Sequence, residues 1–153
     1  MKRKNLLRGI VGASAAATIC LATATAASAN SWVTWTNTQT GKCLGYNQQT
    51  YYAAMVNCGS QSWYDYKVGS NVYQERNSAG SGARCLDSNK RGSVYVGPCE
   101  SGNKNQMWFQ VKMPGLGWTL TNMATGMCLQ SAPNPGFVMT GDCNTHNDYI
   151  YWI

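Results

Sequence analysis

The chain has 153 residues with 12 basic and 6 acidic side chains, which gives a formal charge of +6. Four of the basic residues lie within the first eight positions, and without them the charge falls to about +2. The other Lys and Arg residues are scattered along the sequence, whereas a nucleic-acid-binding surface needs them gathered on one face. Composition and charge therefore argue against nucleic acid as the partner.

Residues 1–29 have the pattern of a secretory signal peptide. The four early cations precede an uncharged run from Ile10 to Ala26, which leads to Ala27-Ser28-Ala29, a small-x-small site for signal peptidase. The run is rich in Ala and Thr, which makes it weak for a membrane-spanning helix, and no second apolar run follows. We expect a secreted, extracellular protein without a membrane span, exported from a bacterial cell, whose mature part is residues 30–153.

The mature part shows the features of β-strands. Short runs of β-branched and aromatic residues alternate with Gly, Asn, Ser and Pro, and no window of a dozen residues has helical periodicity. Because no linker or low-complexity tract divides it, we predict a single all-β domain. The expected strands include residues 32–36, 72–76, 93–96, 107–111, 117–121, 137–140 and 149–153.

Three similar units follow one another in this domain. Each begins with Cys-Leu, crosses a polar turn, passes through an apolar stretch to a second Cys and closes on a Trp. The first cysteines are 42 and 43 residues apart, and the second cysteines are 41 and 44 residues apart. Such a period indicates a repeat architecture. We predict units of approximately 32–68, 69–112 and 113–153, with about twelve short strands around a pseudo-threefold axis.

Six cysteines remain after the leader, and six cysteines permit 15 pairings. If each unit closes on itself, the pairs are Cys43 with Cys58, Cys85 with Cys99, and Cys128 with Cys143. A zinc site is the competing interpretation, but His146 is the sole histidine and no CxxC pair is present, so we expect no metal. An even number of cysteines in an exported chain fits an oxidising compartment.

Two units close on a QxW motif, Gln61-Ser62-Trp63 and Gln106-Met107-Trp108, and the third has Ile150-Tyr151-Trp152 in this place. Motif, period and cysteine positions together resemble the ricin B-chain type β-trefoil lectins, over residues 32–153. The resemblance implies a six-stranded barrel capped by three hairpins, no cofactor, and binding of glycans of the galactose or xylose type. It also implies a structural core formed by Leu44, Trp63, Leu86, Trp108, Leu129 and Trp152.

The family's sugar-binding signature is separate from the QxW tryptophans. An Asp two residues after the first Cys accepts sugar hydroxyls, an aromatic residue two before the second Cys stacks on the sugar, and an Asn before the QxW Gln completes the hydrogen bonds. The middle unit has Asp87, Asn105 and Gln106, but Gly97 occupies the aromatic position. Tyr95 lies on the same strand face, so we expect it to stack on the sugar in a displaced site. The alternative is that Tyr95 only covers the barrel.

The outer two units depart further from the signature, and we expect their sites to be weak or silent. The first has Gly45 in place of Asp and Val56 in the aromatic position; the third has Gln130 and Gly141 in these places. An aromatic patch remains possible in the first unit, from Tyr46, Tyr51 and Tyr52.

The sequence therefore predicts a monomeric, non-catalytic module that binds a glycan or polysaccharide. No two acids show the pairing that glycoside hydrolysis needs, and His146 has neither a GxSxG motif nor a free cysteine for a hydrolytic triad. The alternative is a protein-binding β-trefoil, such as a protease inhibitor or a subunit that docks to a toxin or another partner. Such a protein would use the loops at residues 47–52 and 131–136.

Overall fold

The computed structural model describes residues 30–132, 136–144 and 146–153, and the expected leader lies outside them. These residues form eleven strands and two 3-10 helices, and none of their helices is long and apolar enough to cross a membrane. The elements are β1 (Ser31–Val33), β2 (Cys43–Tyr46), β3 (Ala53–Val56), β4 (Trp63–Gly69), β5 (Val72–Arg76), β6 (Arg84–Ser88), β7 (Val94–Pro98), η1 (Lys104–Gln106), β8 (Trp108–Met113), β9 (Gly117–Asn122), β10 (Cys128–Ser131), β11 (Val138–Gly141) and η2 (Asp148–Ile150).

Five strands and one bridge segment form a closed barrel. Strand β1 pairs with β4, β4 with β5, β5 with β8, and β8 with β9, all antiparallel. The segment around Trp152 takes the sixth position, because Trp152 forms β-bridges with both Trp118 and Asn37. Closure leaves no free edge along this path of the sheet, as the threefold repeat predicted.

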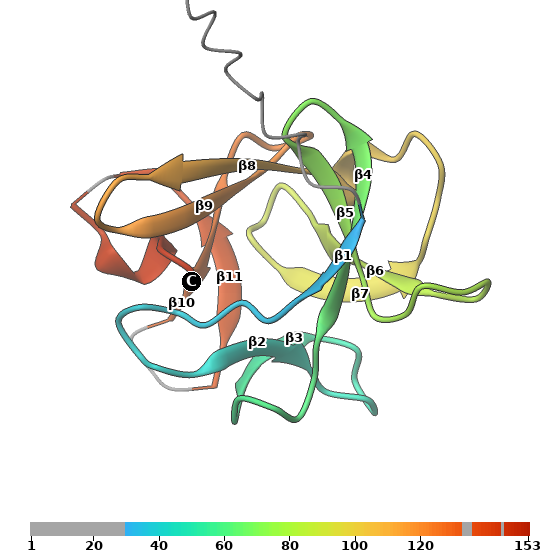
Figure 1. Cartoon of the computed structure of the whole chain (residues 1–153), viewed down its shortest axis with the longest axis horizontal. Helices are drawn as coiled ribbons and strands as arrows, with labels where there is room; N and C mark the ends of the chain where they lie inside the picture. Colours follow the sequence, from blue (N-terminus) through green and yellow to red (C-terminus); the bar gives the residue numbers. More distant parts are fainter. Residues whose placement is uncertain (1–29, 133–135, 145) are drawn as a thin grey trace, which may run out of the picture.

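Three hairpins, β2–β3, β6–β7 and β10–β11, make up the rest of the fold. They lie at three corners around the middle of the molecule, with β2–β3 at the bottom, β6–β7 at the right and β10–β11 at the left of Figure 1. Single β-bridges join the hairpins to one another: Tyr52 to Tyr95, Ala54 to Phe137, and Ser93 to Met139. The structure is thus the β-trefoil that the family resemblance implied, and the repeats correctly predicted its threefold arrangement. Eleven strands and a bridge segment stand in place of the twelve expected strands.

Each unit holds its closing Trp in the same way. The indole Nε1 of Trp63, Trp108 and Trp152 donates to the backbone oxygen of Leu44, Leu86 and Leu129, at 2.9, 3.0 and 3.1 Å respectively. All six side chains are at most 1% exposed. A buried indole N–H needs an acceptor, and the Cys-Leu strand provides one three times. The repeated Leu and Trp residues therefore form the centre of the core.

The disulfides are Cys43–Cys58, Cys85–Cys99 and Cys128–Cys143, with Cα–Cα distances of 5.0, 4.9 and 5.0 Å. Each bond ties the start of one hairpin to the loop that follows it. The first cysteine of every pair is buried, and the second lies nearer the surface. The pairing expected from three self-closing units is confirmed.

The strand expected at residues 149–153 is wrong. Residues Asp148–Ile150 form the 3-10 helix η2, and only Trp152 afterwards makes β-bridges. The cause is local: the Asn147 side chain accepts a hydrogen bond from the Tyr149 backbone N–H and caps the turn, as Asn103 does for Asn105 in η1. The cap overrides the β-propensity of Tyr and Ile, and the turn places Ile150 in the core.

Candidate functional site

Asp87, Tyr95 and Tyr52 form a row across three neighbouring strand segments. Asp87 on β6 is directly opposite Tyr95 on β7, and Tyr95 is directly opposite Tyr52 through a β-bridge. Residues that are directly opposite each other in antiparallel pairs share one face of the sheet. The backbone oxygen of Tyr51 accepts a hydrogen bond from the Val96 N–H at 2.8 Å and holds the two units together here. The row therefore joins a carboxylate to two tyrosines at the junction of the first and second units.

The Asp87 carboxylate lies in a poorly hydrated position, because the residue is only 6% exposed. This burial raises the pKa of Asp87 above its usual value, and the nearby polar side chains of Gln106 and Tyr95 oppose the rise. One carboxylate oxygen, Oδ1, is buried and has no hydrogen-bond partner. Burial and the Asp87 charge in turn raise the pKa of Tyr95. Asp87 thus keeps an unused acceptor beside a tyrosine hydroxyl.

Gln106 and Asn105 have different roles, although both adjoin the same turn. The Gln106 amide is already occupied, since Nε2 donates to the Pro98 oxygen at 2.9 Å and Oε1 accepts from the Glu100 N–H at 2.8 Å. Asn105 lies in η1 and is partly exposed, and its side-chain amide forms no hydrogen bond with another described residue. Asn105 is therefore available to a ligand, whereas Gln106 fixes the loop that carries it.

The tyrosines of the first unit do not form the separate patch that the sequence suggested. Tyr46 packs on Trp63, with ring centroids 6.1 Å apart, and its hydroxyl accepts a hydrogen bond from Asn77 at 3.0 Å. Tyr52 is 59% exposed and lies beside Tyr95. The Tyr51 ring instead stacks with Arg84, whose guanidinium carbon lies 4.1 Å from the ring centroid. Tyr52 therefore extends the middle unit's row. This neighbourhood comes from the β-bridge between Tyr52 and Tyr95, which are 43 residues apart in sequence, so local sequence patterns give no signal for it.

The equivalent positions in the other units are filled by glutamine side chains. In the first unit Gln61 bonds both the N–H and the oxygen of Tyr46, at 2.8 and 3.0 Å, and a Cβ placed on Gly45 would come within 2.7 Å of Gln61 Oε1. In the third unit Gln130 accepts a hydrogen bond from Asn147 at 2.6 Å and its Nε2 would lie 2.6 Å from a Cβ on Gly141. The space that a sugar-binding Asp would use is occupied in both units.

Two acids that the sequence left unpaired lie together inside the barrel. Asp65 and Glu75 are cross-strand neighbours on β4 and β5, and Gln110 donates to both carboxylates, at 3.0 and 2.8 Å. Glu75 Oε2 also accepts from the Trp35 indole at 3.0 Å. The exposed fractions are 6% and 0%, and both carboxylates accept hydrogen bonds from buried side chains. It is a structural pair, and it gives no support to glycoside hydrolysis.

Metal ligation finds no support in the described ranges, where no three His, Cys, Asp or Glu side chains gather in a way that could hold an ion. His146 is exposed, and its ring Nδ1 lies 3.1 Å from Asn144 Oδ1.

Solved structures similar to this chain are β-trefoils. A designed threefold-symmetric protein, ThreeFoil, is 18% identical with a TM-score of 0.67, and the match covers 79% of this chain and 95% of that protein. A Polyporus squamosus lectin, bound to the epitope Neu5Acα2-6Galβ1-4GlcNAc, is 16% identical with a TM-score of 0.69, over 82% of this chain and 49% of the lectin. A Clostridium perfringens endo-β-galactosidase that releases GlcNAcα1-4Gal matches 79% of this chain and 31% of its own length, at 16% identity and a TM-score of 0.68.

At these identities the structural matches show the fold alone. No curated protein matches the chain in sequence. The ricin-type beta-trefoil lectin domain, by contrast, matches residues 31–152, which is nearly the whole described chain. The three Cys-Leu hairpins, their disulfides and the buried QxW tryptophans agree with that match. The chain belongs to the ricin-type β-trefoil lectin domain family.

Proposed function

We propose that this protein is a secreted, non-catalytic carbohydrate-binding module whose main site lies in the middle unit. Sugars present hydroxyl groups to polar side chains and an apolar C–H face to aromatic rings. Asp87 and Asn105 supply the polar groups, and Tyr95 and Tyr52 supply the aromatic surface. The family match supports carbohydrate binding in general, and the residue assignment is our own.

One observation carries the assignment. Of the three equivalent positions after Cys-Leu, only the middle one holds a carboxylate, and its Oδ1 has no partner among the described residues. A buried acceptor left unpaired costs about 1–3 kcal/mol, and a sugar hydroxyl that donates to it removes this cost. Because Asp87 is 6% exposed, we infer that the Tyr95 side chain swings outward when the sugar enters.

A glycan and polysaccharide array with residues 30–153 tests this proposal. The Asp87→Ala variant should lose the signal, and Asp142→Ala, which changes an exposed acid elsewhere in the chain, should keep it. Galactose- and xylose-containing glycans are the first candidates, in keeping with the family resemblance. A signal that survives Asp87→Ala but disappears in Tyr52→Ala would place the site on the tyrosines alone.

Tyr95→Ala decides whether the displaced aromatic surface takes part. Loss of one stacking ring should weaken binding about fivefold. If the variant binds the same glycan as tightly as the unchanged protein, Tyr95 only covers the barrel. A circular dichroism spectrum of each variant establishes that it is folded.

A second candidate function is protein binding by the hairpin face. Tyr52, Phe137 and Met139 are 59%, 66% and 40% exposed and lie on hairpins that the β-bridges hold together. Part of the expected contact loop, residues 133–135, lies outside the described residues. Competition distinguishes the two functions: free monosaccharide displaces a lectin from its target and leaves a protein–protein complex intact. An array without any signal from folded, oxidised protein would favour this second function.

A further inference from the structure

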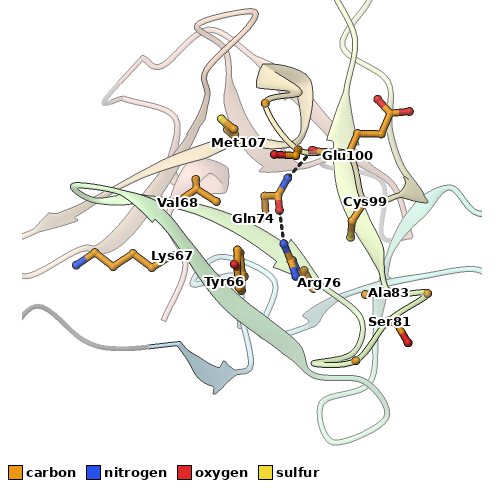
Figure 2. A pocket seen from close by; sticks show the side chains of 14 residues that line it. Tyr66, Lys67, Val68, Gln74, Arg76, Ser81, Ala83, Cys99, Glu100 and Met107 are labelled. Atoms are coloured by element: carbon orange, nitrogen blue, oxygen red, sulfur yellow. Dashed lines mark hydrogen bonds between the residues drawn. The ribbon is translucent and has the colours of Figure 1, made fainter.

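A polar cleft of about 680 Å³ lies away from the row of Asp87, Tyr95 and Tyr52. One wall is the β4–β5 hairpin with Tyr66, Gln74 and Arg76, and the other consists of the loops at residues 80–83 and 99–102 (Figure 2). None of Asp87, Tyr95, Asn105 and Tyr52 lines it. Its volume is in the range of small-molecule sites in proteins. The cleft is thus a separate feature of the surface.

Arg76 is held in a fixed orientation in this cleft. Its guanidinium carbon lies 3.5 Å from the centre of the Tyr66 ring, and Nη2 donates to Gln74 Oε1 at 2.7 Å. Gln74 Nε2 in turn donates to the Glu100 backbone oxygen at 3.0 Å, so that one continuous chain of hydrogen bonds runs from Arg76 to the opposite wall (Figure 2). Stacking on an aromatic ring and a hydrogen bond from Nη2 orient the planar group and leave the Nη1 end for a ligand.

The guanidinium has no anionic partner within the described ranges. Its Nε is buried without a hydrogen bond, and Nη1 makes none with any described side chain or backbone group. The carboxylate of Glu100, which lines the cleft, accepts a hydrogen bond from the Asn103 side chain at 2.9 Å instead. Arginine that is partly buried in a folded protein is ordinarily paired with a carboxylate or phosphate. An oriented guanidinium beside a cavity, with no carboxylate partner among the described residues, has the features of an anion-binding site.

We propose that the cleft binds the carboxylate of an acidic sugar through Arg76. The hydroxyls of Ser81 and Ser101 also line the cleft and make no hydrogen bond with described residues, which suits a ligand rich in hydroxyl groups. The volume accommodates a single sugar residue or a disaccharide, and the Glu100 carboxylate disfavours ligands with several negative charges. The site adds a charge preference to the protein and does not depend on the site at Asp87.

NMR titration of ¹⁵N-labelled residues 30–153 with glucuronate and with glucose tests the proposal directly. The two ligands have the same ring and differ only in the carboxylate. We expect glucuronate to bind about tenfold more tightly than glucose, to shift the Arg76 Nε–H and Gln74 amide signals, and to weaken with added salt. Equal binding of the two ligands, or shifts confined to the neighbourhood of Asp87, would overturn the proposal.

Arg76→Gln should remove the preference for glucuronate. The matched control is Arg84→Gln, which makes the same charge change at an arginine that stacks on Tyr51 outside the cleft. If both variants lose the preference equally, the effect is net charge and the site is disproved. Because Arg76 supports the Tyr66 ring, Arg76→Lys serves as a second variant: it keeps the charge and loses the planar fork, and we expect intermediate affinity.

The two sites can fail independently. Asp87→Ala should leave glucuronate binding at Arg76 unchanged, and Arg76→Gln should leave neutral glycan binding unchanged. If a short poly-glutamate peptide binds at the Arg76 signals and glucuronate does not, the cleft recognises acidic peptides and the proposal of an acidic sugar is wrong.

Discussion

At Gly97 the strand leaves open space where relatives with a complete signature carry an aromatic side chain. A Cβ built there meets nothing nearer than 3.8 Å, and the nearest atom is Gln106 Nε2. Gly97 lies outside the positive-φ positions, so a larger residue fits the backbone without strain. We predict that Gly97→Tyr folds with unchanged stability and binds the middle unit's glycan about fivefold more tightly, because one more ring, besides Tyr95 and Tyr52, contacts the sugar. Isothermal titration calorimetry measures the change.

Gly141→Ala is the matched control, since Gly141 occupies the same position in the third unit. Its Cβ would come within 2.6 Å of Gln130 Nε2, so the Gln130–Asn147 pair must shift and stability should fall. Weaker glycan binding in Gly97→Tyr would mean that the sugar itself occupies the space beside Gln106.

Glu75 stands at a position that apolar residues fill in the other units. Counted from the repeated Asn residues, it is equivalent to Trp35 and Leu120, which are both buried. Burial, and secondarily the Asp65 charge, raises the pKa of Glu75 well above its usual value, and burial raises the pKa of Asp65 as well. The pair therefore retains a proton in the folded protein that the unfolded chain has already released.

This retained proton makes stability depend on pH. In the unfolded chain both carboxyl groups titrate near their usual value of about 4. The folded protein binds more protons above that pH, so the free energy of unfolding should fall as pH rises from about 4 through the raised pKa values. Glu75→Gln should flatten this dependence and make the protein more stable than the unchanged chain above neutral pH. Urea denaturation from pH 4 to pH 9 checks it.

Asp142→Asn is the control for this series, because it removes an exposed carboxyl from the surface and should leave the pH profile as it was. If Glu75→Gln lowers the free energy of unfolding equally at every pH, the hydrogen bonds to Trp35 and Gln110 determine the effect. Proton uptake by the Asp65–Glu75 pair then makes no contribution.

Asp87 and Asn105 could be named from the sequence because their spacing from Cys85 and Gln106 is local. The position of Tyr52 beside Tyr95 could not be predicted in this way, because the β-bridge between them joins two hairpins and the two residues are 43 apart in sequence. The Asp65–Glu75 pair was equally hidden: only the register of β4 against β5 sets them opposite each other. Long-range register is the information that a single sequence lacks.

Among the elements, each hairpin with its disulfide forms one repeated structural unit. The middle disulfide closes a loop between Cys85 and Cys99, which are 14 residues apart in sequence. A cross-link over such a loop contributes about 3 kcal/mol, mainly by restricting the unfolded chain. We predict that the double variant Cys85→Ala, Cys99→Ala lowers the free energy of unfolding by about 3 kcal/mol, which urea denaturation measures. The same variant should lose glycan binding at the middle unit, which calorimetry measures.

The corresponding removal of Cys128 and Cys143 provides the comparison. Stability should fall by a similar amount, because the loop is 15 residues long, while glycan binding should persist. If both double variants lose binding alike, the disulfides act on the fold as a whole.

Most elements could be predicted because strand propensity and repeat position agree. The exception is the chain's last segment, where Asn147 caps a 3-10 turn at a place that Tyr and Ile would otherwise make a strand. The middle unit contains the same turn after Asn103, but its Lys104-Asn105-Gln106 sequence has no strand propensity to compete with the cap. The sequence analysis predicted neither turn, and only at residues 149–153 did it predict a strand in place of one.

In the whole molecule, three asparagines at equivalent positions connect each unit to its neighbour. Asn37 donates to the backbone oxygens of Tyr149 and Tyr151, Asn122 donates to that of Asn105, and Asn77 donates to the Tyr46 hydroxyl. The side-chain Oδ1 of each Asn accepts a hydrogen bond from a backbone N–H of its own unit. The donors are Thr40 for Asn37, Thr125 for Asn122 and Arg84 for Asn77. The repeated Asn, which the sequence indicated only as a turn residue, therefore also joins the units around the axis.

Asn37 should be the most costly of the three to remove. It is fully buried, and besides the bonds to Tyr149 and Tyr151 its Oδ1 accepts from Ser131 at 3.0 Å. We predict that Asn37→Ala lowers the free energy of unfolding by about 3 kcal/mol, because several buried groups lose partners at about 1 kcal/mol each. Thermal and urea denaturation measure it. Asn57→Ala, at an exposed residue bonded to Lys42, should cost less than about 0.5 kcal/mol.

The three indole-to-Leu hydrogen bonds stabilise the core through residues other than the one that differs between the units. The Trp, Leu and Cys residues make the same contacts in each unit. The residue directly after Cys-Leu differs: it is Gly45, Asp87 or Gln130. A duplicated unit can therefore acquire, lose or alter a binding site by substitution at that position and leave its core intact. The three units thus present one scaffold three times, and only the middle unit has a carboxylate at this position.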